Sequence, residues 1–257
     1  MTDFRIIICA DAKFFRFLPA LEANIKRKFG QYPVIFDLGF AEHQLTKLKS
    51  DVIKIQANST YADMTPQGNV RATHKSACVL SFFDRYGANC LYVDADVFFT
   101  DSIAFSEFAG ADVCVTPRHP RELVSKDPFG NGKINTGVLY FRHTPQVIDL
   151  VKAWDEECAN QGISDQLALT RVLEAADLTG HYGDVQLGDI VVRKLDPVIY
   201  NDTGTHSGRI WHFKNAGRRF HKLRRLTYVG WIDGVVPGYL NWLATRRRRA
   251  HQPAVMI

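Results

Sequence analysis

Residues 91–100 read LYVDADVFFT, an apolar run that contains two aspartates, Asp94 and Asp96, separated by one residue. The apolar residues before Asp94 predict a strand buried on both faces, because the run is short, continuous and contains β-branched and aromatic side chains. Ionised carboxylates in such surroundings need a compensating charge. We therefore expect the strand to end at Asp94, with both carboxylates at its carboxyl end.

The segments on either side of this run predict an α/β fold. Residues 4–9 form an apolar run of strand length, and the helix expected after it ends at Gly30, a residue typical of helix C-termini. Strands that alternate with helices favour a parallel sheet. Further strands are expected at residues 34–39, 51–56, 90–94, 111–117, 137–142 and 209–213, and further helices at residues 72–86 and from Thr144 and Ser164 onward.

The helix expected at residues 72–86 should bring basic side chains to the two aspartates. A short turn at Gly87 separates it from the strand at residues 90–94, so the two elements should run antiparallel. With a rise of about 1.5 Å per helical residue and about 3.3 Å per strand residue, the start of the helix lies beside the end of the strand. Arg71 and Lys75 are therefore expected near the two aspartates.

Composition and length predict one cytoplasmic domain. The 257 residues are 46% hydrophobic and 23% charged, and a chain of this length buries roughly 70–75% of its unfolded surface. No apolar run of about 18 residues predicts a transmembrane helix, and the first residues show neither a basic leader nor a cleavage site. The five cysteines lack metal-binding spacing, which is typical of reduced thiols in the cytoplasm.

The basic excess is concentrated at the C-terminal end. Residues 218–257 are interpreted as a tail that carries RRFHKLRRL and RRRR, with Trp231, Tyr239 and Trp242 among them. Basic and aromatic side chains together favour contact with a membrane surface, here at residues 230–249 and at the inner face of the cell membrane. The alternative is a solvated basic end. A nucleic-acid partner is not expected, because no recognised binding motif accompanies the charge.

The two aspartates are candidate ligands of a divalent cation. Ligands of open α/β sheets gather at the carboxyl ends of the strands, and one intervening residue places Asp94 and Asp96 on the same side of an extended chain. Carboxylate oxygens suit Mg²⁺ or Mn²⁺, which commonly also contact substrate phosphates. The alternative is a strand end followed by a turn, since aspartate is frequent in turns.

Four strings in a fixed order carry a family resemblance: LYVDADVFF, INTGVLYF at residues 134–141, SDQLAL at residues 164–169 and IWHFKNAG at residues 210–217. They resemble glycosyltransferases with the A-type fold, and most specifically family 8, which includes glycogenin and bacterial lipopolysaccharide galactosyltransferases. The resemblance extends from the first strand to about Gly217. It implies a single Rossmann-like nucleotide-diphospho-sugar transferase domain, with a mixed, mainly parallel central sheet flanked by helices.

The resemblance implies both a function and a division of the chain. Residues 1–217 would form the transferase domain, with a nucleotide-binding half at residues 1–100 and a half for acceptor and donor sugar at residues 101–217. The activity implied is metal-dependent transfer of a sugar from a nucleotide-diphosphate donor, a UDP-sugar being favoured, with retention of configuration. The acceptor would be a glycan or a lipid-linked saccharide.

The resemblance also implies roles for individual residues. Mn²⁺ or Mg²⁺ would be held by Asp94, Asp96 and His212. Catalytic roles fall to Asp165, Gln166 and Asn135. Substrate contacts fall to Ala10, Asp11, Arg71, Lys75, Ala95, Gly137 and Lys214. The chain departs from the family pattern in two ways: Lys214 comes too early, and the Lys-Pro-Trp ending of the family is absent. The contact of Lys214 with the diphosphate therefore has less support from the sequence than the other assignments.

Each matched position also has a structural interpretation. Residues 135–137 are typical of a turn, and Asp11 can be a turn aspartate. Ser164 suits a helix N-cap and Asp165 the positive end of the helix dipole, although capping does not account for Gln166. His212 lies in an apolar strand and could be structural, with His206 as the competing ligand.

Three other functions share parts of the pattern. A haloacid-dehalogenase-type phosphatase also has Asp-x-Asp after an apolar strand, and GDVQLGD at residues 183–189 is similar to its later acidic motif. However, Phe98 stands where that family has threonine or valine. A sugar-nucleotide nucleotidyltransferase would need a glycine-rich loop after Cys9. The non-enzymatic alternative is a nucleotide-sugar binding module without turnover.

Overall fold

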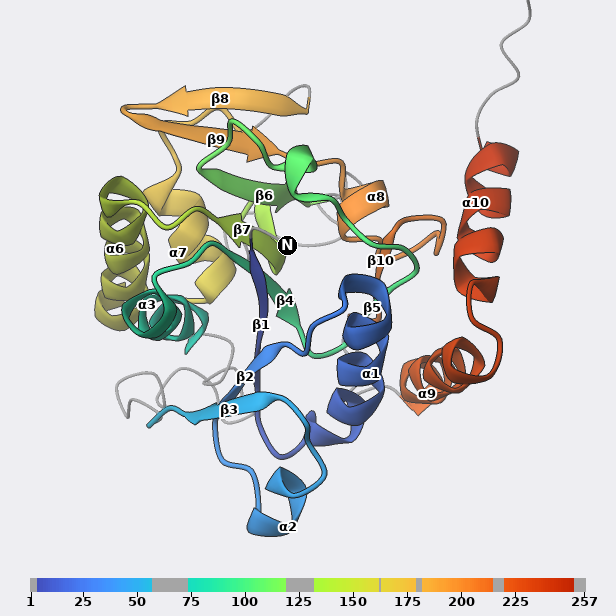
Figure 1. The fold of residues 1–257 in the computed structure, drawn as a ribbon. Helices are drawn as coiled ribbons and strands as arrows, with labels where there is room; N and C mark the ends of the chain where they lie inside the picture. The colour runs from blue at the N-terminus through green and yellow to red at the C-terminus, as the bar shows by residue number, and fades with distance from the viewer. Residues whose placement is uncertain are drawn as a thin grey trace, which may run out of the picture.

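The computed structural model describes residues 4–56, 74–118, 132–161, 163–178, 182–214 and 220–251. Its centre is an eight-stranded sheet with the strand order β3-β2-β1-β4-β7-β6-β9-β8 (Figure 1). The strands are β1 (Arg5–Ala10), β2 (Val34–Asp37), β3 (Asp51–Lys54), β4 (Cys90–Asp94), β6 (Val113–Pro117), β7 (Ile134–Phe141), β8 (Gly183–Leu187) and β9 (Ile190–Lys194). Strands β3, β2, β1 and β4 are parallel, β7 is antiparallel to both β4 and β6, β9 is parallel to β6, and β8 is antiparallel to β9. The predicted mixed sheet is confirmed.

Helices cover both faces of this sheet (Figure 1). On β1, Ile7 and Cys9 face one hydrophobic cluster, whereas Ile6 and Ile8 face another, because successive strand residues point to opposite faces. The first cluster includes residues of α3 (Lys75–Tyr86), α6 (Pro145–Gln161) and α7 (Asp165–Val172), and the second includes residues of α1 (Leu18–Phe29). The remaining short helical segments are η1 (Phe15–Phe17), α2 (Glu42–Leu45), η4 (Phe105–Glu107) and α8 (Pro197–Tyr200).

Strand β7 begins earlier than predicted. It starts at Ile134 instead of residue 137, so Asn135 and Gly137 lie within a fully buried strand and not in a turn. The pairing of β6 with β7 shifts register between Val115 and Thr116. The turn interpretation of residues 135–137 is therefore wrong, and the backbone groups that a turn would expose are buried in the sheet.

The strand that follows the two aspartates belongs to a second sheet, which has two strands. Strand β5 (Val97–Phe99) pairs antiparallel with β10 (Ile210–His212), and Val97 lies opposite His212. The amide of Phe213 also donates to the carbonyl oxygen of Asp96 at 2.8 Å. This pairing brings together segments that are more than a hundred residues apart in the sequence.

The C-terminal segment is folded against the domain. It contains α9 (Phe220–Val235) and α10 (Tyr239–His251), and α9 runs beside α1 (Figure 1). Asp233 of α9 is buried, pairs with Arg27 and accepts a hydrogen bond from Asn24 Nδ2 at 3.0 Å. Within the described residues, no helix is long and apolar enough to cross a bilayer.

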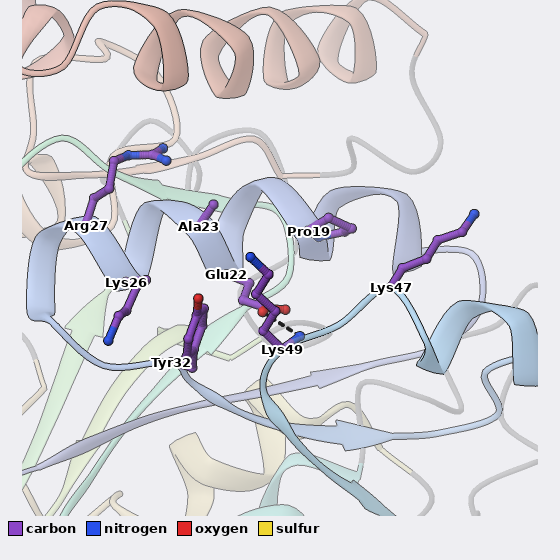
Figure 2. Close-up of a pocket in the computed structure, with 8 residues that line it drawn as sticks. All are labelled: Pro19, Glu22, Ala23, Lys26, Arg27, Tyr32, Lys47 and Lys49. Carbon is purple, nitrogen blue, oxygen red and sulfur yellow. Dashed lines mark hydrogen bonds between the residues drawn. The ribbon is translucent and has the colours of Figure 1, made fainter.

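A basic pocket of about 320 Å³ lies on the flank of α1 (Figure 2). Its floor contains Glu22, whose Oε1 accepts a hydrogen bond from the amide of Lys49 at 2.7 Å. The pocket is lined by Pro19, Glu22, Ala23, Lys26, Arg27, Tyr32, Lys47 and Lys49. None of these residues is among those that the sequence analysis assigned to a site.

Candidate active site

Two carboxylates and one imidazole converge where β4 ends. His212 Nε2 lies 3.3 Å from Asp96 Oδ1 and 3.7 Å from Asp94 Oδ2. One ligand atom from each of the three residues lies within 4.8 Å of the others, and Asp96 and His212 are buried. The pairing of β5 with β10 produces this arrangement by placing His212 beside the turn that contains Asp96. Two carboxylate oxygens and an imidazole nitrogen form a donor set that suits Mn²⁺ or Mg²⁺.

The imidazole of His212 is oriented by Asn201. His212 Nδ1 lies 2.7 Å from Asn201 Oδ1, and an amide oxygen only accepts hydrogen bonds, so Nδ1 carries the proton. Asn201 is itself fixed, because its Nδ2 donates to Thr116 Oγ1 at 2.7 Å. The lone pair of Nε2 is therefore directed at the two carboxylates, which is the orientation of a metal-binding histidine.

Gly137 of β7 leaves room for this imidazole. A Cβ atom at Gly137 would lie 2.7 Å from His212 Nδ1 and 3.1 Å from Asn135 Oδ1, closer than real Cβ atoms approach the ring. Gly137 also donates its amide to Asn135 Oδ1 at 3.0 Å. A glycine inside a strand often marks a close approach of another group, and here that group is His212.

Lys75, at the start of α3, reaches into the same site. Its Nζ lies 2.8 Å from Asp94 Oδ1, 3.2 Å from Asp165 Oδ2 and 3.1 Å from Thr136 Oγ1. The predicted approach of Lys75 to Asp94 is confirmed. Burial by itself would lower the pKa of Lys75, but the carboxylates of Asp165 and Asp94 outweigh it and raise the pKa above its usual value. The lysine is charged at neutral pH.

Asp94 is held as a carboxylate with one oxygen directed at the imidazole. Burial raises its pKa, but the ammonium group of Lys75 and the hydrogen bonds from Lys75 and Tyr92 outweigh burial, and the pKa lies below the usual value. Lys75 and the hydroxyl of Tyr92, at 3.1 Å, both donate to Oδ1. Oδ2 is the oxygen that faces His212.

The charges of these groups do not balance. Counting the aspartates as carboxylates, the formal charges of Asp94, Asp96, Asp165 and Lys75, the groups whose mutual contacts the structure describes here, sum to −2 in a largely buried cluster. Buried carboxylates without sufficient compensation are costly. A divalent cation between the two aspartates and His212 would restore neutrality, and the side chains present fit one.

Helix α7 begins at this cluster with Asp165, which is followed by Gln166. Ser164 caps the helix, since its Oγ accepts from the amide of Leu167 at 3.2 Å. Asp165 is buried, and its Oδ2 accepts a hydrogen bond from Thr136 in addition to the ion pair with Lys75. Gln166 differs, because its Oε1 is buried without a hydrogen-bond partner in the described part of the chain. Such an acceptor suits a hydroxyl group of a substrate.

The other predicted residues are distributed around the cluster. Ala10 ends β1, and Asp11 follows at the same edge of the sheet, because Cys9 pairs with Asp94 in the parallel ladder. Asp11 Oδ1 accepts from the amides of Lys13 and Phe14, as a turn aspartate does. Ala95 is buried, Lys214 follows β10 and is partly buried, and Arg71 lies outside the described residues.

His206 does not join the cluster. Its ring packs against Trp211 and Phe213, with centroid distances of 5.3 and 5.2 Å, and its Nδ1 contacts the carbonyl oxygen of Gly204. Sequence reasoning missed Thr136, which joins Lys75 to Asp165, and Asn201, which orients His212. Asn201 stands before Asp-Thr-Gly, a context typical of turns, and no local signal marks it as a partner of a distant histidine.

Replacing Lys75 by methionine should lower the free energy of unfolding by about 3–5 kcal/mol, because it leaves buried carboxylates without their cation. Urea denaturation measures the change. Methionine keeps the length of the side chain, so lost packing contributes little. The matched control is Lys47→Met at an exposed lysine, where a change within about 0.5 kcal/mol is expected. Equal effects of the two substitutions would contradict a charge-balancing role for Lys75.

A mixed eight-stranded sheet, with Asp-x-Asp at the carboxyl end of the central strand β4 and a histidine brought to it by β10, agrees with the A-type glycosyltransferase fold that the sequence resembles. Residues 42–218, more than half of the chain, match the family model of nucleotide-diphospho-sugar transferases. The chain belongs to this family and is a glycosyltransferase. The family match favours this class over the phosphatase alternative, whose second acidic motif forms β8 and the following turn at the edge of the sheet.

Solved glycosyltransferase structures share the fold. An active-site mutant of LgtC has a TM-score of 0.55 at 13% identity over 88% of this chain and 94% of that chain. The galactosyltransferase LgtC in complex with donor and acceptor sugar analogs has a TM-score of 0.52 at 12% identity, covering 88% and 95%. A glycosyltransferase involved in glycosylation of the major capsid of PBCV-1 has a TM-score of 0.51 at 11% identity, covering 86% and 99%. No curated protein matches the sequence.

Proposed function

We propose that the protein is a metal-dependent glycosyltransferase that moves a sugar from a nucleotide-diphosphate donor, with a UDP-sugar favoured, to a glycan or lipid-linked saccharide. Retention of configuration is proposed from the resemblance to family 8. The observation that carries the proposal is the cluster of the partly buried Asp94 with the buried Asp96 and His212, in which an imidazole lone pair faces two carboxylates. A Mn²⁺ or Mg²⁺ ion held there supplies a Lewis acid for the departing diphosphate.

The side chains of the chain itself would bind and orient the donor. The three hydrogen atoms of the Lys75 ammonium group have partners within the protein, so Lys75 acts mainly by holding Asp94 and Asp165 in place. Gln166 Oε1 offers an acceptor to a hydroxyl of the donor sugar near its anomeric centre. Asp165 lies beside it, and its Oδ2 is occupied by Thr136 and Lys75, which favours positioning of the sugar over nucleophilic attack.

The remaining donor contacts are assigned to residues at the carboxyl ends of the strands and in the segments that follow them. We assign the nucleobase and ribose to the region of Ala10 and Asp11, because β1 ends beside β4. The diphosphate is assigned to the surroundings of Ala95 and Lys214, next to the metal cluster. Asn135, held by Gly137, would contact the donor sugar. Arg71 is assigned to the nucleotide sugar by resemblance.

Thermal-shift measurements with UDP-, GDP- and CMP-sugars, each with and without Mn²⁺, test this function. Stabilisation by one nucleotide sugar only when Mn²⁺ is present, together with donor hydrolysis, is the expected result. Stabilisation without hydrolysis or transfer would identify a binding module instead. Absence of stabilisation by every nucleotide sugar would contradict the proposal.

We also propose that the C-terminal helices contact an anionic membrane surface at its cytoplasmic side. On each helix the face opposite the buried residues is aromatic and basic: Tyr228 and Trp231 of α9 and Trp242 of α10 are 59%, 62% and 53% exposed. The guanidinium of Arg246 lies 5.5 Å from the centroid of the Trp242 ring. Exposed aromatic rings beside arginines suit the interface between headgroups and acyl chains.

The double substitution of Trp231 and Trp242 by serine should weaken binding to phosphatidylglycerol vesicles by at least about tenfold, because each buried aromatic side chain contributes more than about 1 kcal/mol. Co-sedimentation measures the binding. Tyr182→Ser is the matched control, because Tyr182 is 49% exposed but lies outside these helices. Equal binding of the double variant and the unchanged protein would exclude this surface.

A further inference from the structure

Helix α10 holds the loop that leads to the metal cluster. Arg248 Nη1 donates to the carbonyl oxygen of Ser207 at 2.7 Å, and Arg247 Nη1 donates to that of His206 at 3.2 Å. Ser207 is buried, and both arginines are half-buried. The guanidinium of Arg247 also lies 5.8 Å from the centroid of the Trp211 ring. Two neighbouring arginines of one helix thus fix two successive carbonyl groups of one loop.

The loop at residues 202–208 is a tightly bonded unit. The carboxylate of Asp202 accepts hydrogen bonds from the amides of Gly204, Thr205, Ser207 and Gly208. Burial raises the pKa of Asp202, but these hydrogen bonds, that of Gly208 foremost, lower it below its usual value. Because Ser207 shares the Asp202 carboxylate with the other amides, a displacement of Ser207 would also displace the rest of the loop.

One residue of the loop adopts an uncommon backbone conformation. His206 has φ at 52°, in the left-handed region that a side chain other than glycine rarely adopts. Such a conformation costs about 1 kcal/mol or more and persists where the surroundings fix it. The hydrogen bond from Arg247 to the carbonyl oxygen of His206 is one of the contacts that fix it.

The start of this unit positions His212. The carbonyl oxygen of Asp202 accepts the amide of His212 at 2.9 Å, and the preceding residue, Asn201, accepts the proton of His212 Nδ1. The carbonyl oxygen of Gly208, at the other end of the loop, accepts Trp211 Nε1 at 3.0 Å. Backbone and side chain of the histidine segment are thus both held by the loop that α10 fixes.

We propose that Arg248, assisted by Arg247, is a positioning residue for His212. By fixing the loop at residues 202–208, Arg248 keeps Asn201 in place, and Asn201 keeps the Nε2 lone pair directed at Asp94 and Asp96. The C-terminal helices are then part of the scaffold of the active site although they contribute no metal ligand. The identity of the ligand, a divalent cation, rests on the proposed function.

Arg248→Ala in the full chain tests the proposal, with Mn²⁺ titration followed by electron paramagnetic resonance in the absence of nucleotide. We expect Mn²⁺ affinity to fall by about 10-fold or more, as for loss of other groups that orient metal ligands. Arg248→Lys, which keeps a donor, should recover part of the affinity. Arg249→Ala, at the exposed neighbouring arginine, is the matched control and should bind Mn²⁺ as the unchanged protein does. Donor hydrolysis should show a higher KM for Mn²⁺ with little change in kcat.

A second readout needs neither metal nor turnover. Nitrogen-15 NMR of the metal-free protein, recorded at a pH at which the spectrum itself shows one proton on the ring, should show His212 protonated at Nδ1, with the signal assigned by its loss in His212→Gln. In Arg248→Ala a mixture of the two tautomers is expected. In the Asn201→Ala background, Arg248→Ala should have little further effect on Mn²⁺ affinity, because both act on the same ring.

The outcomes distinguish failure of the positioning role of Arg248 from failure of the proposed glycosyltransferase function. An unchanged His212 tautomer and unchanged Mn²⁺ affinity in Arg248→Ala would overturn the positioning role, as would additive losses in the double variant. If Arg248→Ala does not fold, the comparison of Arg248→Lys with Arg249→Lys decides by the same two readouts. Mn²⁺ binding to the unchanged protein without turnover of any nucleotide sugar would contradict the proposed function and leave the positioning role standing.

Discussion

Asp96→Asn should abolish the Mn²⁺-dependent stabilisation by the nucleotide sugar and lower kcat/KM for transfer by about 10²–10³-fold or more. Asparagine has nearly the same shape as aspartate, so the buried site is refilled and the fold should persist. The substitution removes a full negative charge 3.3 Å from His212 Nε2 and replaces a strong oxygen ligand by an amide. Thermal shift with and without Mn²⁺, followed by donor hydrolysis, measures both effects.

The control for Asp96 is Asp189→Asn. Asp189 is exposed in the turn between β8 and β9 and belongs to the acidic string that suggested a phosphatase. Activity and metal dependence should be unchanged in this variant. If Asp96→Asn instead retained metal-dependent stabilisation while Asp189→Asn lost activity, the assignment of the metal to Asp94, Asp96 and His212 would be wrong.

Local geometry made the fold and one contact of the site predictable. Buried strands show as short apolar runs, and the strands around Asp94 are of this kind because helices cover both faces of the sheet. The contact between Lys75 and Asp94 was predictable as well, since it depends only on a helix and a strand joined by a short turn at Gly87. Rise per residue is enough to place such neighbours.

Contacts formed across the sheet were not predictable from local patterns. The start of β7 was missed because Asn135 and Gly137 are poor strand formers, and at Gly137 the missing side chain leaves room for His212. Asn201 meets His212 because the segment after α8 bonds to β10, where Asp202 bridges Trp211 and the amide of His212 donates to the carbonyl oxygen of Asp202. The spacing of residues in the sequence does not predict the contact between Asn201 and His212.

In the C-terminal helices, composition did not predict which side chains are buried. Their composition is basic, and the face of α9 that packs on the domain contains a charged residue, Asp233, among the apolar Leu226 and Val229. Because Asp233 pairs with Arg27 of α1, a position that reads as solvent-exposed is one of the most buried in the helix. The aromatic residues Tyr228 and Trp231 are exposed on the same helix.

Gly137→Ala should lower Mn²⁺ affinity by about 10–100-fold and the free energy of unfolding by about 1–3 kcal/mol. The added Cβ would lie 2.7 Å from His212 Nδ1, so the ring must move away from Asn201 or from the two carboxylates. The backbone of Gly137 is that of an ordinary strand residue, so the effect arises from the contact and not from a forbidden conformation. Mn²⁺ titration and urea denaturation measure the two changes.

Gly204→Ala is the matched control for Gly137→Ala. A Cβ at Gly204 would meet no atom within 4 Å, and the φ of Gly204 lies outside the left-handed region. The same one-carbon addition should therefore leave stability and Mn²⁺ affinity nearly unchanged, although Gly204 belongs to the loop that follows Asn201. Unchanged Mn²⁺ affinity in Gly137→Ala would mean that the position of His212 does not determine metal binding. Loss in Gly137→Ala alone would link the glycine of β7 to the imidazole of β10, and through it to the metal.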